Sequence, residues 1–184
     1  MSLYVSKSFS SNMEKITSEN VDSIYEILNK ELNLLGLNED LKVHGGVVMC
    51  DLGARESTYD IDAYYKHIEI IDSITERTFG FDKINNDVEA YLSPNGEYRL
   101  YKEFSNLKVY YATDEYLLAL KCRSCRTEGN DIKDLKYLLD KLNISSIQEV
   151  DKIILKFFNS DQVGVLYRDL IDDYLSGTLD YYFI

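Results

Sequence analysis

Apolar side chains return at helical intervals near the start of the chain and at strand intervals soon afterwards. From Ser18 to Leu35 they recur every three or four residues, which predicts a helix with one apolar face. Ser18 is expected to cap this helix and Gly36 to end it. Residues 41–44 and 59–64 instead predict extended segments, in which polar and apolar side chains alternate.

A glycine pair separates these two predicted strands. Gly45 and Gly46 follow the first strand and precede the apolar run 47–49, so we expect a glycine turn and then a short helix. In the second strand Asp60 and Asp62 fall on one face, while Ile61 points toward the core. The chain thus brings two carboxylates to one side of an extended segment.

The middle of the chain continues with a helix over residues 68–79 and with segments rich in tyrosine and valine. Pro94 marks a turn between two of these segments. Strands are predicted over residues 88–92, 98–104 and 107–111.

After Thr113 every segment has helical periodicity. Caps are expected at Thr113, at Asn130 and at Ser146 with Glu149. The sequence therefore predicts an α+β fold, a mixed β-sheet flanked by helices, with residues 1–112 as the core and residues 113–184 as a helical part packed on it. The apolar end of the chain, residues 179–184, is expected to dock on the domain or on a second copy.

Composition narrows the class of protein. The chain has 184 residues, of which 45% are hydrophobic and 28% charged, as in ordinary folded domains. It contains neither a membrane-length apolar run nor the apolar core of a secretory signal, and its three cysteines give no even disulfide framework. We therefore expect a cytoplasmic protein.

The net charge of -12 disfavours nucleic acid as a general partner, because an acidic surface repels a polyanion. The net charge does not exclude a nucleoside triphosphate as a ligand, since a divalent cation neutralises its phosphates. Asp60 and Asp62 suit Mg²⁺, which prefers oxygen ligands and completes its shell with water and substrate phosphates. Gly45 and Gly46 offer backbone N–H groups to an anion at the start of a helix.

The order of these elements is more specific than any one of them. Gly45-Gly46, then Arg55 to Tyr59, then Asp60 to Asp62 resembles the signature of the DNA polymerase beta-type nucleotidyltransferase superfamily. Leu117 to Lys121 and Asp131 to Leu135 are similar to downstream helices of bacterial nucleotidyltransferase-like proteins, which include toxin components of abortive-infection toxin-antitoxin pairs. The resemblance covers about half the chain and implies a nucleotidyltransferase-type sheet.

The resemblance also implies roles for individual residues. Asp60 and Asp62 would bind Mg²⁺ and serve as the catalytic pair. The residues expected to contact the nucleotide are Gly45, Gly46, Arg55, Ser57 and Lys121. The family pattern usually has a third carboxylate, expected here on the strand 107–111, which carries none. The nearby substitutes are Glu89, Glu97 and Glu103.

Two acidic residues and two cysteines further along the chain have no predicted catalytic role. Asp131 and Asp134 fit a first helical turn, where acidic side chains favour the helix dipole. Cys122 and Cys125 have C-x-x-C spacing without a second pair, so neither zinc nor redox chemistry is expected.

The sequence leads to one hypothesis with a rival. The first is Mg²⁺-dependent transfer of a nucleoside monophosphate from a triphosphate to an acceptor hydroxyl, in a protein that is one component of a toxin-antitoxin pair. The rival is a catalytically inactive binding or regulatory protein with the same fold. An antitoxin or other protein partner, an RNA acceptor, and association between copies all remain open, whereas a membrane is not expected.

Overall fold

The computed structural model describes residues 15–79, 83–86, 89–125 and 130–178. The expected α+β class with a mixed sheet is confirmed, with the five strands in the order β3-β2-β1-β5-β4. The strands are β1 (Glu39–His44), β2 (Ile61–Tyr64), β3 (Ile84–Asn85), β4 (Tyr98–Glu103) and β5 (Leu107–Ala112). The helices are α1 (Val21–Leu35), α2 (Gly46–Asp51), α3 (Ile68–Phe79), α4 (Asp114–Arg123), α5 (Asp131–Lys141), α6 (Ile147–Phe157) and α7 (Leu166–Leu175).

Strand directions bring several element ends to one edge of the sheet. β1 runs parallel to β5 and antiparallel to β2, and β2 runs parallel to β3. The C-terminal ends of β1 and β5 therefore lie at the same edge as the N-terminal ends of β2 and β3. Helices α2 and α4 leave from that edge, directly after β1 and β5.

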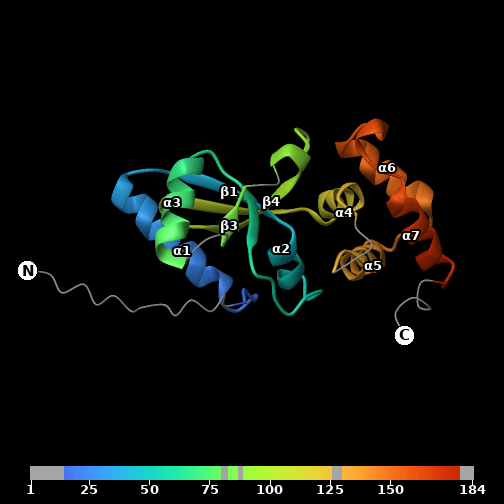
Figure 1. The fold of residues 1–184 in the computed structure, drawn as a ribbon, viewed down its shortest axis with the longest axis horizontal. Coiled ribbons are helices and arrows are strands. Elements are labelled where there is room, and N and C mark those ends of the chain that lie inside the picture. Colours follow the sequence, from blue (N-terminus) through green and yellow to red (C-terminus); the bar gives the residue numbers. More distant parts are fainter. Residues whose placement is uncertain (1–14, 80–82, 87–88, 126–129, 179–184) are drawn as a thin grey trace, which may run out of the picture.

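Helices α1, α2 and α3 cover one face of the sheet. Alternate strand residues such as Val43, Ile61 and Val109 are fully buried against them. Tyr25 of α1 meets Tyr111 of β5 on this face, with 3.3 Å between their hydroxyl oxygens. Figure 1 shows α1 and α3 side by side at one end of the molecule and α4 to α7 gathered at the other. This burial of alternate residues is what the period of two in the strands requires.

The opposite face of the sheet is only partly covered. Helix α4 packs at its edge, where Tyr116 makes an edge-on contact with the ring of Tyr98 at 5.5 Å between centroids. The alternation and the strand register place on this face a set of side chains that includes both carboxylate and aromatic groups. The set is Asp40, Lys42, His44, Asp62, Tyr64, Asn85, Tyr98, Leu100, Lys108, Tyr110 and Ala112.

Several predicted boundaries hold, and two need correction. Gly36 ends α1 with a φ of 67°, and α3 has the predicted bounds. However, α1 begins at Val21 and Asn20 precedes it, so Ser18 lies outside the helix. The predicted strand 88–92 is wrong, because residues 89–91 form the 3-10 helix η1 (Glu89–Tyr91). Its residues are exposed, so no sheet partner supplies the burial that would hold them extended.

The described part of the chain after residue 113 consists of α4 to α7 and the 3-10 helix η2 (Ser160–Gln162). Thr113 caps α4 by accepting a hydrogen bond from the backbone of Tyr116, as expected. Ahead of α6, the backbone N–H of Ser146 donates to the Glu149 carboxylate at 3.2 Å. Asn130 makes no side-chain cap to α5. The C-terminal segment 179–184 lies outside the described residues.

Among the described helices, none has the length and apolar character needed to cross a bilayer.

Candidate active site

The predicted aspartate pair lies at the sheet edge where β1 ends and β2 begins. Asp60 immediately precedes β2, and Asp62 is its second residue. On the two neighbouring strands Asp62 has His44 of β1 and Asn85 of β3 as its register partners. The carboxylates are therefore flanked by a histidine on one side and an amide on the other.

Gly45 is required at its position by the Asp62 side chain. Its φ of 70° is in the left-handed region, and a Cβ atom built on it would lie 2.3 Å from Asp62 Oδ2. Any other residue would push the carboxylate away or move the turn. The predicted glycine turn and aspartate strand thus meet in direct van der Waals contact.

Gly46 makes the corresponding contact with Thr58. A Cβ atom on Gly46 would lie 2.4 Å from Thr58 Oγ1, and that hydroxyl donates to Asp60 Oδ1 at 3.2 Å. Thr58 thereby orients the first aspartate. Ser57, which was expected to face the triphosphate, is partly exposed and makes no side-chain hydrogen bond to the described residues. The hydroxyl that contacts Asp60 is that of the neighbouring Thr58, and a contact of Ser57 with a triphosphate stays a prediction.

Asn85 of β3 lies beside the aspartates, on a strand for which the sequence predicted no ligand. Its Nδ2 donates to Asp60 Oδ2 at 3.4 Å, and the amide lies close enough to Asp62 to favour its ionised form. The proposed substitutes do not reach the pair. Glu89 and Glu97 are exposed, and Glu103 pairs with Lys108. Because β3 has only two residues, sequence periodicity could not reveal it.

The site concentrates negative charge in a partly desolvated place. Burial and the nearby Asp60 raise the pKa of Asp62 from 3.8 to about 6, against smaller opposing effects of Asn85, Lys121 and Arg55. Keeping Asp62 ionised at neutral pH therefore costs free energy that an added cation would recover. Asp60 lies close enough to Asp62 to raise its pKa, as a shared cation requires.

His44 is neutral in this setting. Burial, reinforced by the positive charge of Lys121, lowers its pKa from 6.5 to about 4. Its side chain is 2% exposed, and Nε2 has no hydrogen-bond partner among the described residues. A buried ring nitrogen without a partner is uncommon, and this one lies beside the carboxylates.

The two cations expected to bind phosphate are held by carboxylates of α5. Arg55 makes a two-pronged ion pair with Asp134, whose side chain is fully buried. Lys121 contacts the same carboxylate and Asp131, each at 2.8 Å. Asp134, interpreted from the sequence as a helix-start residue, is thus the anchor that joins the loop before β2 to α4 and α5. Both cations lie close enough to Asp62 to influence its pKa.

The donor set can be tested against Mg²⁺. The described residues hold no cluster of three or more His, Cys, Asp and Glu side chains suited to a metal. Mg²⁺ commonly uses one or two carboxylates and fills its remaining positions with water and phosphate oxygens. Asp60 and Asp62 meet that need for one ion, and Asn85 adds a neutral neighbour. The residues present therefore fit a single substrate-bound Mg²⁺ better than an all-protein cage.

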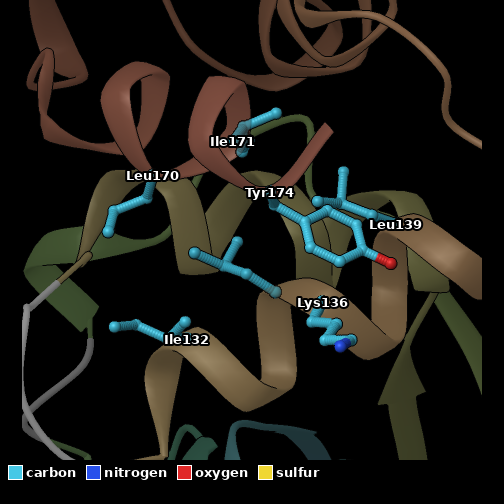
Figure 2. A pocket seen from close by; sticks show the side chains of 7 residues that line it. Ile132, Lys136, Leu139, Leu170, Ile171 and Tyr174 are labelled. Atoms are coloured by element: carbon cyan, nitrogen blue, oxygen red, sulfur yellow. The ribbon is translucent and has the colours of Figure 1, made fainter. Parts of the chain in front are cut away.

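A separate hollow between α5 and α7 is not a competing site. Figure 2 shows that it lies between the facing side chains of the two helices, mostly apolar ones. Its volume of about 10 Å³ accommodates about one water molecule. The lining residues are Ile132, Leu135, Lys136, Leu139, Leu170, Ile171 and Tyr174.

Comparison with known proteins adds one solved structure. No family model matches the sequence, and no curated protein matches it. The chain is similar to the crystal structure of an antigenic nucleotidyltransferase-like protein from Paracoccidioides brasiliensis, with 16% sequence identity and a TM-score of 0.47. The match covers 91% of this chain and 95% of that chain. At this identity and TM-score the likeness does not show a common family.

Proposed function

We propose that the protein binds a nucleoside triphosphate with Mg²⁺ at Asp60 and Asp62 and transfers the nucleoside monophosphate to an acceptor hydroxyl. The observation that carries the proposal is the contact of Gly45 with the Asp62 carboxylate. This contact joins the glycine turn and the aspartate strand into one site, and the resemblance of the sequence to nucleotidyltransferases gives that combination its function.

The residues of the site have different roles in the proposed reaction. Asp60 and Asp62 hold the cation, and Thr58 and Asn85 fix the orientation of Asp60 through hydrogen bonds. Gly45 allows the turn to approach the Asp62 carboxylate, and Gly46 allows it to approach Thr58. Bound Mg²⁺ would neutralise phosphate charge and stabilise the leaving pyrophosphate.

Thermal unfolding with Mg²⁺ and each of the four common ribonucleoside triphosphates tests the binding step. A ligand present at a hundred times its Kd stabilises the folded state by about 2.7 kcal/mol, which for a chain of this length raises Tm by roughly 5–10 °C. The Asp60→Asn, Asp62→Asn double variant should lose this shift. The matched control is Asp161→Asn with Asp169→Asn, two exposed carboxylates of the helical part.

Incubation with labelled triphosphates and a cell extract then tests the transfer and identifies the acceptor. Labelled product that depends on both aspartates supports the proposal. If the double variant keeps the full wild-type Tm shift, Asp60 and Asp62 do not bind the Mg²⁺–triphosphate complex.

A second function is favoured by two specific observations. Asn85 places a neutral amide, and not a carboxylate, beside the aspartates, and Asp134 already neutralises Arg55 and Lys121. A protein with these features could bind a nucleotide without reacting, as a regulatory or binding component. Nucleotide-dependent stabilisation without any labelled product would favour this alternative.

The toxin-antitoxin assignment and the cytoplasmic location stay predictions of the sequence. A chain with a net charge of -12 selects a partner with a basic surface. Copurification of a basic protein in a stoichiometric complex tests the assignment.

A further inference from the structure

Next to the aspartate pair, the partly open face of the sheet carries a cross-strand row of aromatic and basic side chains. Lys42 of β1 has Tyr64 of β2 and Tyr110 of β5 as its register partners on either side. Leu100 of β4 extends the row beyond Tyr110. The first three side chains are partly exposed, and Leu100 is 51% exposed. We refer to these four residues as the tyrosine row.

Lys42 lies among aromatic rings without a carboxylate. Its Nζ is 5.8 Å from the ring centre of Tyr64 and 5.3 Å from that of Tyr98. It forms no ion pair with any described residue, although acidic residues outnumber basic ones by 32 to 20. Several other lysines do pair with carboxylates, namely Lys102, Lys108, Lys121, Lys141 and Lys156. An ammonium group that has aromatic neighbours but no carboxylate partner among the described residues is suited to an incoming anion.

The tyrosine row adjoins the proposed active site. Asp62 is two residues before Tyr64 on β2, and His44 is two residues after Lys42 on β1. Side chains two residues apart on a strand share a face and lie about 7 Å apart. A planar group stacked on the row would therefore place its attached atoms beside the carboxylates.

We propose that the tyrosine row binds the acceptor of the transfer reaction and that this acceptor is a free nucleoside monophosphate. The inference rests on the proposed function of Asp60 and Asp62. The base stacks on the tyrosine rings, and the acceptor phosphate pairs with Lys42. A ribose hydroxyl then faces the aspartate pair.

The chemical step balances with these two substrates alone. The ribose hydroxyl oxygen of the acceptor forms a bond to the α-phosphorus of the triphosphate. The bond from that phosphorus to the oxygen bridging to the β-phosphate breaks, and pyrophosphate leaves with its electron pair. The hydroxyl proton passes to water. The product is a dinucleotide joined by a phosphodiester.

Charge favours a single nucleotide over a nucleic-acid strand. The tyrosine row offers one ammonium group, and the neighbouring site offers two carboxylates. Strand binding requires several phosphate contacts, each with a cation, whereas one nucleotide requires one. Stacking, which needs no net charge, supplies the remaining affinity.

Calorimetric titration with adenosine 5′-monophosphate, in low salt without Mg²⁺ or triphosphate, tests the row directly. Tyr64→Leu and Lys42→Gln should each weaken binding about tenfold, because each removes one stacking or charge contact. Tyr64→Phe, which keeps the ring, and Lys156→Gln on α6 should bind like the wild type. Wild-type affinity in both Tyr64→Leu and Lys42→Gln, or absence of binding by the wild type, would overturn the inference.

Two further measurements distinguish binding at the tyrosine row from binding at the aspartate pair and from binding of a nucleic-acid strand. The Asp60→Asn, Asp62→Asn variant should still bind adenosine 5′-monophosphate, because the row does not need the metal. If that variant loses binding while Lys42→Gln keeps it, the nucleotide occupies the aspartate site and the row is not the acceptor site. A ten-residue oligoadenylate that binds more tightly than the mononucleotide, with a steep salt dependence, would replace the proposed acceptor by a nucleic acid.

Discussion

Asn85 lies opposite Asp62 in the β2–β3 pair and donates a hydrogen bond to Asp60. Its amide is neutral, so the present site offers two negative charges to a cation. Replacing it by aspartate should raise the affinity for Mg²⁺ about tenfold, because affinity for hard cations follows the number of charged ligands. Calorimetric titration with Mg²⁺ measures the change.

The neighbouring residue provides the control for that substitution. Asn86 directs its Nδ2 to Glu89 at 3.5 Å and not to the aspartates. Asn86→Asp adds the same charge without adding a ligand. Equal gains in both variants would mean that general electrostatics, and not the position of Asn85, determines the affinity.

The raised pKa of Asp62 makes the stability of the metal-free protein depend on pH. Between its unfolded value of 3.8 and its folded value of about 6, the folded chain holds more protons than the unfolded chain. The free energy of unfolding therefore falls as pH rises through this window, by about 3 kcal/mol in total. Asp62→Asn should show a smaller fall in urea unfolding measured near pH 4 and pH 7.

Mg²⁺ should raise the free energy of unfolding, which is opposite to the effect of rising pH. At pH 7 it should stabilise the wild type more than Asp62→Asn, since the cation offsets the cost of ionising Asp62. An identical pH profile for Asp62→Asn and the wild type would show that this carboxyl titrates normally.

The buried Asp134 should be essential to stability. Asp134→Asn leaves Arg55 and Lys121 without their shared counter-charge, which should cost about 3–5 kcal/mol. Asp131→Asn is the matched control, because Lys121 is the only ion-pair partner of Asp131 among the described residues and the Asp131 side chain is 16% exposed. Urea unfolding of the two variants should give a much larger loss for position 134, and equal losses would refute the anchor role.

Gly45→Ala should damage the site more than its backbone strain alone explains. Both Gly45 and Gly53 have positive φ, but a Cβ atom at Gly53 would meet nothing within 4 Å. Gly53→Ala should therefore cost about 1–2 kcal/mol and leave ligand binding intact. Gly45→Ala should cost more and also abolish the nucleotide-dependent Tm shift, because it displaces the Asp62 carboxylate. Retention of that shift would show that nucleotide binding at the aspartates does not depend on the glycine turn.

Local patterns in the sequence were sufficient for the elements that bear the site. The period of two around Asp60 and Asp62 and the position of Gly45 and Gly46 depend on neighbouring residues, and the structure places all four together. Thr113 likewise reveals its cap through short-range sequence signals.

Long-range pairing was not accessible in the same way. Asn85 reaches the site through a two-residue strand whose partner is 23 positions earlier, and no periodicity marks so short an element. Asp134 was interpreted by its place in a helix, whereas its role comes from Arg55, 79 residues away. Charge partners of this kind follow from topology, which the pattern of polar and apolar residues does not specify.

The carboxylate of Asp134 also affects how the protein unfolds. It binds Arg55, from the segment that leads into the aspartate strand, and Lys121, from the first helix of the C-terminal half. Pulling the helices away from the sheet would break the Arg55–Asp134 ion pair, because Arg55 would stay with the sheet while Asp134 left together with Lys121. The two halves are thus expected to melt together, and an excised sheet half would lose the ion pair that holds the segment before Asp60 in place.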